Sequence, residues 1–245
     1  MLDIHNHALP AVDDGARTLD EAVEIVKGLS ECGFTALAPS PHHGGGTGGD
    51  VEPHVAAVAR QSLTEALEAQ GMAMELLPNS EHCVTPELFE RMGDGAEITT
   101  IGGSGRWLLV ELPWEGLPRF DDHLFRIQTK GYRIVLAHPE RYQFMEPDHA
   151  RRLVDRGIKL QLEIGSFVGM YGDRARKRAE SLLDSGHVHV LASDVHRPEQ
   201  CQWVAQSLDL LRRSFGDSVV EHGCSSNPRA LVDNCDPDAL ESLMS

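Results

Sequence analysis

The sequence predicts an α/β fold, a barrel or near-barrel of seven parallel strands. Apolar runs alternate with helical patterns along the whole chain, and this alternation is typical of parallel strands joined by helices. Seven such runs occur, which is close to the number that closes a (βα) barrel. The length of 245 residues suits one α/β barrel, so we expect a single domain over residues 1–245.

The predicted strands are apolar runs that end in polar residues, and each of the first six is followed by a stretch with helical periodicity. Thr18 and Glu21 are spaced as a capping box at the start of the first helix. Pro198 is placed to open a last one. We expect strands at residues 2–7, 35–42, 74–81, 107–112, 133–138, 159–165 and 187–196, and helices at about 19–32, 51–70, 86–92, 120–130, 148–156, 174–184 and 198–215.

One low-complexity segment, GGGTGGD at residues 44–50, follows the second predicted strand. We interpret it as a mobile loop. It lacks the Lys-Ser/Thr ending of a P-loop, so it does not predict a loop that cradles nucleotide phosphates. No sequence repeat and no linker composition divides the chain, which favours one domain.

The charge of the chain restricts its partners. A formal net charge of -16, from 38 acidic and 22 basic residues, would repel nucleic acid and anionic membranes, so neither is expected as a partner. An anionic substrate would then need local positive charge. Divalent metal ions are an economical source, because a bound ion is often the largest charge in its site.

The cysteines predict reduced thiols in a cytoplasmic protein. Five cysteines, an odd number without CxxC spacing, fit neither a disulfide framework nor a structural zinc site. The first residues, MLDIHNH, do not read as an export signal, and no run of about 18 apolar residues predicts a membrane span.

Ligand-type side chains stand at the ends of most predicted strands. Parallel barrels place their active sites at these carboxyl ends, where the loops converge. Residues two apart on a strand share a face, so His5 with His7, and Asp194 with His196, can each point toward one place. Strand six ends in Glu163 and Ser166 without an obvious metal ligand. The candidate metal ligands are His5, His7, Asp14, His42, Glu81, Glu111, His138, Asp194 and His196.

A second His-x-His pair shows why position matters more than the motif. His187 and His189 have the same spacing as His5 and His7, and with 13 histidines in the chain such pairs arise by chance. Because they begin strand seven, on the face of the barrel that serves stability, we predict a structural role for them.

The ligand types indicate the kind of metal. Five imidazoles and four carboxylates without a thiolate favour divalent ions such as manganese, iron, zinc or magnesium. Nine ligands exceed what one ion needs. We therefore expect two or three ions that share Glu81 as a bridge, an arrangement that activates water and holds phosphoryl oxygens.

Several motifs together resemble a known family. They are MLDIHNHALPAVDDG at residues 1–15, SPHH at 40–43, NSE at 79–81, LLVELP at 108–113, AHPERY at 137–142 and ASDVH at 192–196. These segments resemble the PHP (polymerase and histidinol phosphatase) superfamily. The DDG, VELP and HPERY segments, with NPRAL at 227–231, are most similar to its bacterial capsule-type manganese-dependent protein-tyrosine phosphatases.

The resemblance covers essentially the whole chain and implies a distorted (βα)7 TIM-like barrel of PHP type with a trinuclear metal centre. It implies dephosphorylation of the tyrosine-rich tail of a bacterial tyrosine kinase in exopolysaccharide or capsule regulation. NSEHC at 79–83 and QLEIGS at 161–166 depart from the family pattern, which bears on substrate choice. By motif, the first metal corresponds to His5, His7, Glu81 and Asp194, the second to Glu81, Glu111 and His138, and the third to Asp14, His42 and His196.

The expected reaction is hydrolysis of a phosphate monoester by in-line attack of a metal-bridged hydroxide. We expect His42, His196 and Arg141 to take part in catalysis. Arg141 lies three residues past His138, where its planar fork can hold two phosphate oxygens. A surface salt bridge is the alternative role for Arg141.

Other functions remain as alternatives. The first is a small-molecule phosphatase of histidinol-phosphate or nucleotide type, because the loops and not the metals select the substrate. The second is a catalytically silent partner that keeps its metals for folding. A cysteine phosphatase is disfavoured, because neither Cys83 nor Cys224 has an arginine at the required spacing. The kinase partner, the general acid and the oligomeric state are left open.

Overall fold

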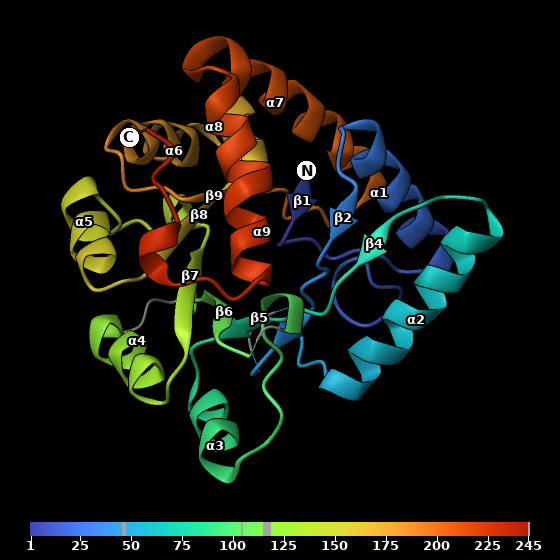
Figure 1. The fold of residues 1–245 in the computed structure, drawn as a ribbon, viewed down its shortest axis with the longest axis horizontal. Coiled ribbons are helices and arrows are strands. Elements are labelled where there is room, and N and C mark those ends of the chain that lie inside the picture. The colour runs from blue at the N-terminus through green and yellow to red at the C-terminus, as the bar shows by residue number, and fades with distance from the viewer. Residues whose placement is uncertain (46–47, 104, 115–118, 245) are drawn as a thin grey trace.

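The strands of the protein lie parallel at the centre of the molecule, with helices around them (Figure 1). This computed structural model describes residues 1–45, 48–103, 105–114 and 119–244. One sheet has the order β1-β2-β4 and the other the order β3-β5-β6-β7-β8-β9. The strands are β1 (Leu2–Asp3), β2 (Ala36–Leu37), β3 (His42–His43), β4 (Glu75–Leu76), β5 (Glu81–Cys83), β6 (Trp107–Glu111), β7 (Arg133–Ala137), β8 (Lys159–Glu163) and β9 (Val190–Ala192).

Two of the seven predicted strands are each divided in the structure. The prediction at 35–42 becomes β2 and β3, and the prediction at 74–81 becomes β4 and β5. Pro39 and Pro41 lie between the first pair and Pro78 between the second. Proline has no N–H to donate to a sheet, so the strand pairing is interrupted there. The seven strand positions are confirmed, but continuous strands over 35–42 and 74–81 were a wrong prediction.

The first and last strands meet and close the ring. The predicted strands at 2–7 and 187–196 are longer than β1 and β9, yet pairing continues beyond both as an isolated bridge between Asn6 and Val195. Asp194 N–H donates to the His5 carbonyl at 2.7 Å, and His7 N–H donates to the Val195 carbonyl at 2.9 Å. The distorted TIM-like barrel is therefore confirmed.

Most helices form an outer ring, whereas α9 (Asn227–Val232) lies over the strands near the middle of the view (Figure 1). All seven predicted helices are present, and their termini lie within about two residues of the prediction, except that a short 3-10 turn precedes the last one. Among the described residues, no helix is long and apolar enough to cross a membrane. The helices are α1 (Leu19–Glu31), α2 (Pro53–Ala69), α3 (Pro86–Asp94), α4 (Phe120–Thr129), α5 (Pro147–Asp155), α6 (Asp173–Asp184), α7 (Cys201–Phe215), α8 (Asp217–Glu221) and α9 (Asn227–Val232).

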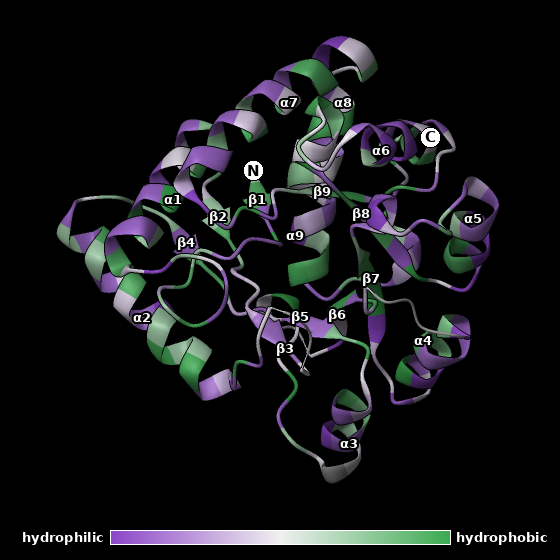
Figure 2. Ribbon diagram, turned by 180° about the vertical axis from the view of Figure 1, so that it is seen from behind, coloured by the Kyte–Doolittle hydropathy of each residue, from purple (hydrophilic) through white to green (hydrophobic). Residues whose placement is uncertain are grey.

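The strand side chains alternate between two apolar clusters. On β6, Leu108 and Val110 belong to the cluster between sheet and helices, whereas Trp107 and Leu109 belong to the smaller cluster inside the barrel. The ribbons of the outer helices alternate between apolar and polar residues, as helices with one buried face do (Figure 2). Leu231 of α9, a helix that the sequence did not predict, joins the inner cluster with Trp107. The C-terminal segment thus contributes to the apolar interior of the barrel.

Candidate metal centre

All nine predicted ligands come together at the carboxyl ends of the strands. The inner face of β6 continues from Trp107 and Leu109 to Glu111, so the period of two brings this carboxylate to the centre. A bend at Ile4 changes the alternation of the first strand, and His5 and His7 follow it. Four overlapping groups have ligand atoms within 4.8 Å of one another: His7, Asp14, His42 and His196; His5, His7 and Glu81; His5, His138 and Asp194; and His42, Glu81 and Glu111.

Glu81 lies at the centre of this cluster and is almost wholly buried. Its Oε1 is 2.8 Å from Nε2 of His138 and 3.3 Å from Nε2 of His5. Its Oε2 is 3.1 Å from Nδ1 of His42. The carboxylate therefore reaches imidazoles that come from three separate strands, which is the position expected for a bridging ligand.

Two aspartates complete the cluster on either side of His7. Asp194 Oδ1 lies 3.1 Å from Nε2 of His5 and 3.3 Å from Nε2 of His7. Asp14 Oδ1 lies 3.3 Å from Nε2 of His42 and 3.4 Å from Nε2 of His196. Asp14 is the exposed member, so the cluster opens to solvent on the side of the loop after β1.

The spacing of the ligand atoms allows groupings besides those that the resemblance implied, and the division among ions stays a prediction. Glu111 groups with His42 and Glu81, and its distance from Nδ1 of His42 is 3.5 Å. His138 groups with His5 and Asp194 as well as contacting Glu81. The residues are those that the sequence singled out, and the close spacing lets several of them serve more than one ion.

The unpaired polar atoms of the cluster fit a bound cation. Buried polar atoms are nearly always hydrogen-bonded in proteins. Nε2 of His5, Nε2 of His7, Nδ1 of His42 and Oδ1 of Asp194 are buried and close to one another or to carboxylates, but none makes a well-aligned hydrogen bond among the described residues. All four point into the same group of imidazoles and carboxylates, the donor set that divalent transition metals prefer. The residues present therefore fit a metal centre.

The electrostatics of the cluster agree with this fit. Burial by itself would lower the pKa of His5, but the charges of Glu81 and Asp194 outweigh it and raise that pKa well above the usual value. Burial also opposes the charge on His42, yet bonds to Asp14 and Glu111 raise its pKa to about 11. The carboxylates thus stabilise positive charge strongly, and divalent cations would supply that charge without protons.

Two histidines are held from behind by side chains that the sequence did not single out. Nδ1 of His7 lies 2.8 Å from Oδ2 of Asp13, and Nδ1 of His5 lies 2.8 Å from Oε1 of Gln161. Such contacts fix the ring so that its other nitrogen, Nε2, faces the metal. The period of two along β8 could have identified Gln161, because Leu160 and Leu162 belong to the outer cluster.

Two ligand positions have unusual backbone. His138 has φ of 36° and Asp194 has φ of 49°, both in the left-handed region that residues other than glycine seldom adopt. This conformation costs about 1–3 kcal/mol at each position. Its occurrence at two candidate ligands indicates that the strands end in turns shaped for the site.

Arg141 lies beside the cluster and pairs with two buried carboxylates, those of Glu163 and Asp194. Its Nη1 donates to Oε1 of Glu163 at 2.8 Å and to Oδ2 of Asp194 at 3.2 Å. Its guanidinium carbon lies 4.2 Å from the ring centroid of Trp114 and 4.6 Å from that of Tyr171. Burial opposes its charge, but Glu163 and Asp194 raise the pKa of Arg141 further. Strand six therefore contributes Glu163, which the sequence left without a role.

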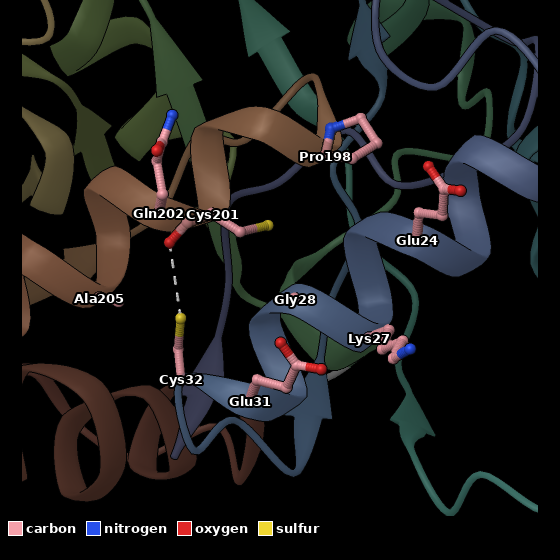
Figure 3. Close-up of a pocket in the computed structure, with 9 residues that line it drawn as sticks. All are labelled: Glu24, Lys27, Gly28, Glu31, Cys32, Pro198, Cys201, Gln202 and Ala205. Carbon is pink, nitrogen blue, oxygen red and sulfur yellow. Dashed lines mark hydrogen bonds between the residues drawn. The ribbon is translucent and has the colours of Figure 1, made fainter.

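Other sequence features lie outside the cluster. His189 is buried at the start of β9 and belongs to none of the four groups, as its predicted structural role requires. Cys32, Cys201, Cys224 and Cys235 are free thiols. A hollow of about 530 Å³ lies between α1 and α7 and shares no lining residue with the cluster. Cys32 is one of its lining residues, and the Sγ of Cys32 lies 3.6 Å from the carbonyl oxygen of Cys201 (Figure 3).

The glycine-rich loop over residues 44–50 is held at its two ends. Gly44 N–H donates to Asp50 at 3.0 Å, which ties the ends of the predicted mobile loop together. Residues 46–47 of that loop lie outside the described part of the chain. The mobility of the loop stays a prediction.

Fold and site together define a class, the (βα) barrel proteins built around a metal centre at the carboxyl ends of the strands. Within this class, the chain belongs to the CpsB/CapC family of capsular polysaccharide synthesis, whose family model matches residues 1–233. This membership agrees with the resemblance seen in the motifs.

Relatives cover most of the chain. It is 29% identical over 238 residues to tyrosine-protein phosphatase YwqE of Bacillus subtilis, which covers 96% of this chain and 92% of that protein. It is 32% identical over 200 residues to the putative tyrosine-protein phosphatase CapC of Staphylococcus aureus, covering 80% and 77%. A solved chain matches with a TM-score of 0.84 and 27% identity over 96% of this chain and 95% of that one; it comes from work described as crystal structures of YwqE from Bacillus subtilis and CpsB from Streptococcus pneumoniae, unique metal-dependent tyrosine phosphatases.

Proposed function

We propose that this protein is a metal-dependent protein-tyrosine phosphatase whose site consists of the nine clustered ligands and Arg141. The observation that carries this proposal is the position of Arg141, whose Nη1 lies 3.2 Å from Asp194, itself a candidate ligand. The guanidinium and divalent ions bound to the neighbouring ligands would together provide two kinds of positive charge at one place. Phosphate monoesters, which carry two negative charges near neutral pH, require such a place.

The proposed metals are two or three manganese ions held by His5, His7, Asp14, His42, Glu81, Glu111, His138, Asp194 and His196. Bound divalent ions supply a water of lowered pKa and positive charge for phosphoryl oxygens. Asp13 and Gln161 hold the rings of His7 and His5 so that Nε2 of each is presented to the centre.

Arg141 orients the phosphate. Among the described residues, both of its side-chain hydrogen bonds use Nη1, which leaves Nε and Nη2 for two phosphate oxygens. His42 and His196, on either side of the exposed Asp14, lie where the substrate enters the cluster. A tyrosinate leaving group has a pKa of about 10, so it needs less protonation than a serine alkoxide would.

The substrate we propose is a phosphotyrosine tail of a bacterial tyrosine kinase, and the process is capsule or exopolysaccharide regulation. Family membership and the names of YwqE and CapC support this proposal. The free thiols support a cytoplasmic setting.

The test compares two substrates on one preparation. The purified protein is freed of metal with a chelator and assayed on a tyrosine phosphopeptide and on histidinol phosphate at equal concentration. We expect no turnover without metal, recovery with manganese and preference for the phosphopeptide. Activity that survives chelation contradicts the metal mechanism, whereas preference for histidinol phosphate would indicate a small-molecule phosphatase. Binding of manganese without turnover of either substrate would indicate a silent partner protein.

A further inference from the structure

Trp114 lies at the edge of the metal centre and contacts two residues of the site. Its ring centroid is 5.2 Å from that of the candidate ligand His138, and the two ring planes are inclined by 21°. The guanidinium carbon of Arg141 lies 4.2 Å from the indole centroid. Even so, 41% of Trp114 stays exposed. A large aromatic surface is thus presented to solvent directly beside the proposed phosphate-binding group.

Tyr171 is a second aromatic residue in contact with Arg141. Its ring centroid lies 4.6 Å from the guanidinium carbon of Arg141, so two aromatic rings contact the same cation. Glu163 and Asp194 hold the Nη1 corner of that guanidinium. With one corner and both rings in place, Arg141 has little freedom to turn. A phosphate bound to Arg141 would therefore have a fixed position relative to Trp114.

Because the phosphate has a fixed position relative to Trp114, the group esterified to the phosphate determines what lies against the indole. In an aryl phosphate the ring follows directly on the ester oxygen, within a few ångströms of the phosphorus. Aromatic pairs attract one another at centroid separations of about 4.5–7 Å. Because Trp114 lies 4.2 Å from the guanidinium carbon, a ring attached to a phosphate on Arg141 can reach this range. An alkyl phosphate, as in phosphoserine, offers no aromatic ring there.

We propose that Trp114 is a specificity-determining residue that contacts the aromatic ring of an aryl phosphate held by Arg141. The inference rests on the proposed function, and it names the element that selects tyrosine over serine phosphate. Trp114 acts on the ring of the substrate, whereas Tyr171 positions Arg141. The two roles are separable, because loss of the ring contact should spare ligands that consist of phosphate alone.

Two inhibitors distinguish these roles in the manganese-loaded protein. Inorganic phosphate engages the centre without a ring, and phenylphosphonate adds the ring. In Trp114→Leu we expect the inhibition constant of phenylphosphonate to rise about two- to tenfold, with that of phosphate unchanged. Trp114→Phe, which keeps an aromatic ring, should restore most of the difference. Phe125→Leu is the matched control, since Phe125 is also exposed and lies 5.7 Å from a guanidinium, that of Arg156.

A second measurement works even where the leucine variant does not fold. Phenylphosphonate should change the tryptophan fluorescence of the wild-type protein, and this change should be lost in Trp114→Phe although Trp107 and Trp203 remain. If Trp114→Leu weakened the binding of both inhibitors equally, Trp114 would serve to position Arg141, and the proposal would be overturned. The proposal would also be overturned if neither inhibition constant changed, or if Trp114→Phe kept the fluorescence response to phenylphosphonate. Failure of the proposed function itself is seen separately, as a wild-type protein that does not hydrolyse the tyrosine phosphopeptide.

Discussion

His7 and Asp13 are joined by a contact of 2.8 Å between Nδ1 and Oδ2, so the imidazole is held on the side away from the cluster. Asp13 is itself fixed, because its Oδ1 accepts the N–H of Gly15 at 2.9 Å. Burial by itself would lower the pKa of His7, but the charge of Asp13 raises it to about 9. The pair therefore sets the orientation of the ring and increases its basicity.

Asp13→Asn should weaken metal binding without removing a ligand. The amide keeps the size of the carboxylate but not its charge, and loss of such a partner typically costs about 10–100-fold in metal affinity. Manganese titration of the metal-free protein, followed calorimetrically, measures this change. Asp20→Asn, at the exposed start of α1, is the control and should bind manganese as the wild-type protein does. An Asp13 variant with unchanged affinity would show that His7 needs no such support.

Arg141→Lys should impair turnover although the positive charge is kept. Lysine has no planar fork and cannot give two parallel hydrogen bonds to phosphate. We expect kcat/KM on p-nitrophenyl phosphate to fall about 100-fold, the scale for loss of one donor to a transition state. Arg156→Lys, at the C-cap of α5, changes an arginine that also lies over an aromatic ring and should leave kcat/KM unchanged. Equal activity in the two variants would return Arg141 to the role of a structural ion pair.

The sequence was sufficient to single out the candidate ligands because most of them stand at or just past the end of a predicted strand. Glu111 ends β6 and His138 directly follows β7, and both strands are continuous in the structure, so the two positions could be inferred from the apolar runs before them. Glu81 follows a strand divided at Pro78, yet the chain keeps its direction and the carboxylate still reaches the centre.

The residues around the ligands could not all be found in the same way. Gln161 and Glu163 were visible in principle, since both share the inner face of β8. The contact of Trp114 with Arg141 depends on how two loops pack, for which the sequence has no periodic signal. The short C-terminal helices α8 and α9 were missed because they have too few turns to show a period.

His189 should make stability depend on pH. Burial, together with the charge of Lys159, lowers the pKa of His189 to about 3, against about 6.5 in an unfolded chain. Between these values only the unfolded chain binds the proton, so this part of the stability is present above pH 6.5 and is lost as the pH falls. From pH 6.5 to pH 5 the loss is about 2 kcal/mol.

Urea unfolding at several pH values tests this dependence through a difference. His189→Leu should remove about 2 kcal/mol of the decline between pH 6.5 and pH 5, while contributions from other groups cancel against the wild-type protein. Leu160→Ala, at the residue whose carbonyl accepts the N–H of His189, should lower stability equally at both pH values. If His189→Leu also changed the unfolding free energy by the same amount at both pH values, His189 would not take up a proton on unfolding.

His138→Ala and Cys83→Ser should separate metal catalysis from thiolate catalysis. His138 contacts Glu81 at 2.8 Å within the cluster, so its loss should abolish turnover of p-nitrophenyl phosphate. Cys83 is buried, and no arginine follows at the spacing that a phosphate loop needs, so Cys83→Ser should retain most of the activity. An active His138 variant together with an inactive Cys83 variant would favour a cysteine nucleophile.

Gly15→Ala should disturb His7 through the backbone alone. A Cβ at position 15 would lie 2.2 Å from the His7 carbonyl oxygen and 2.5 Å from the His7 Cβ, so the loop after β1 or the strand end must move. We expect a loss of about 1–3 kcal/mol in unfolding free energy and weaker manganese binding. Gly93→Ala is the matched control, since nothing lies within 4 Å of a Cβ there and alanine suits helix α3 better than glycine does. Denaturation and manganese titration of both variants decide the matter: a Gly15 variant that matches the Gly93 variant in both would show that the close approach to His7 is not required.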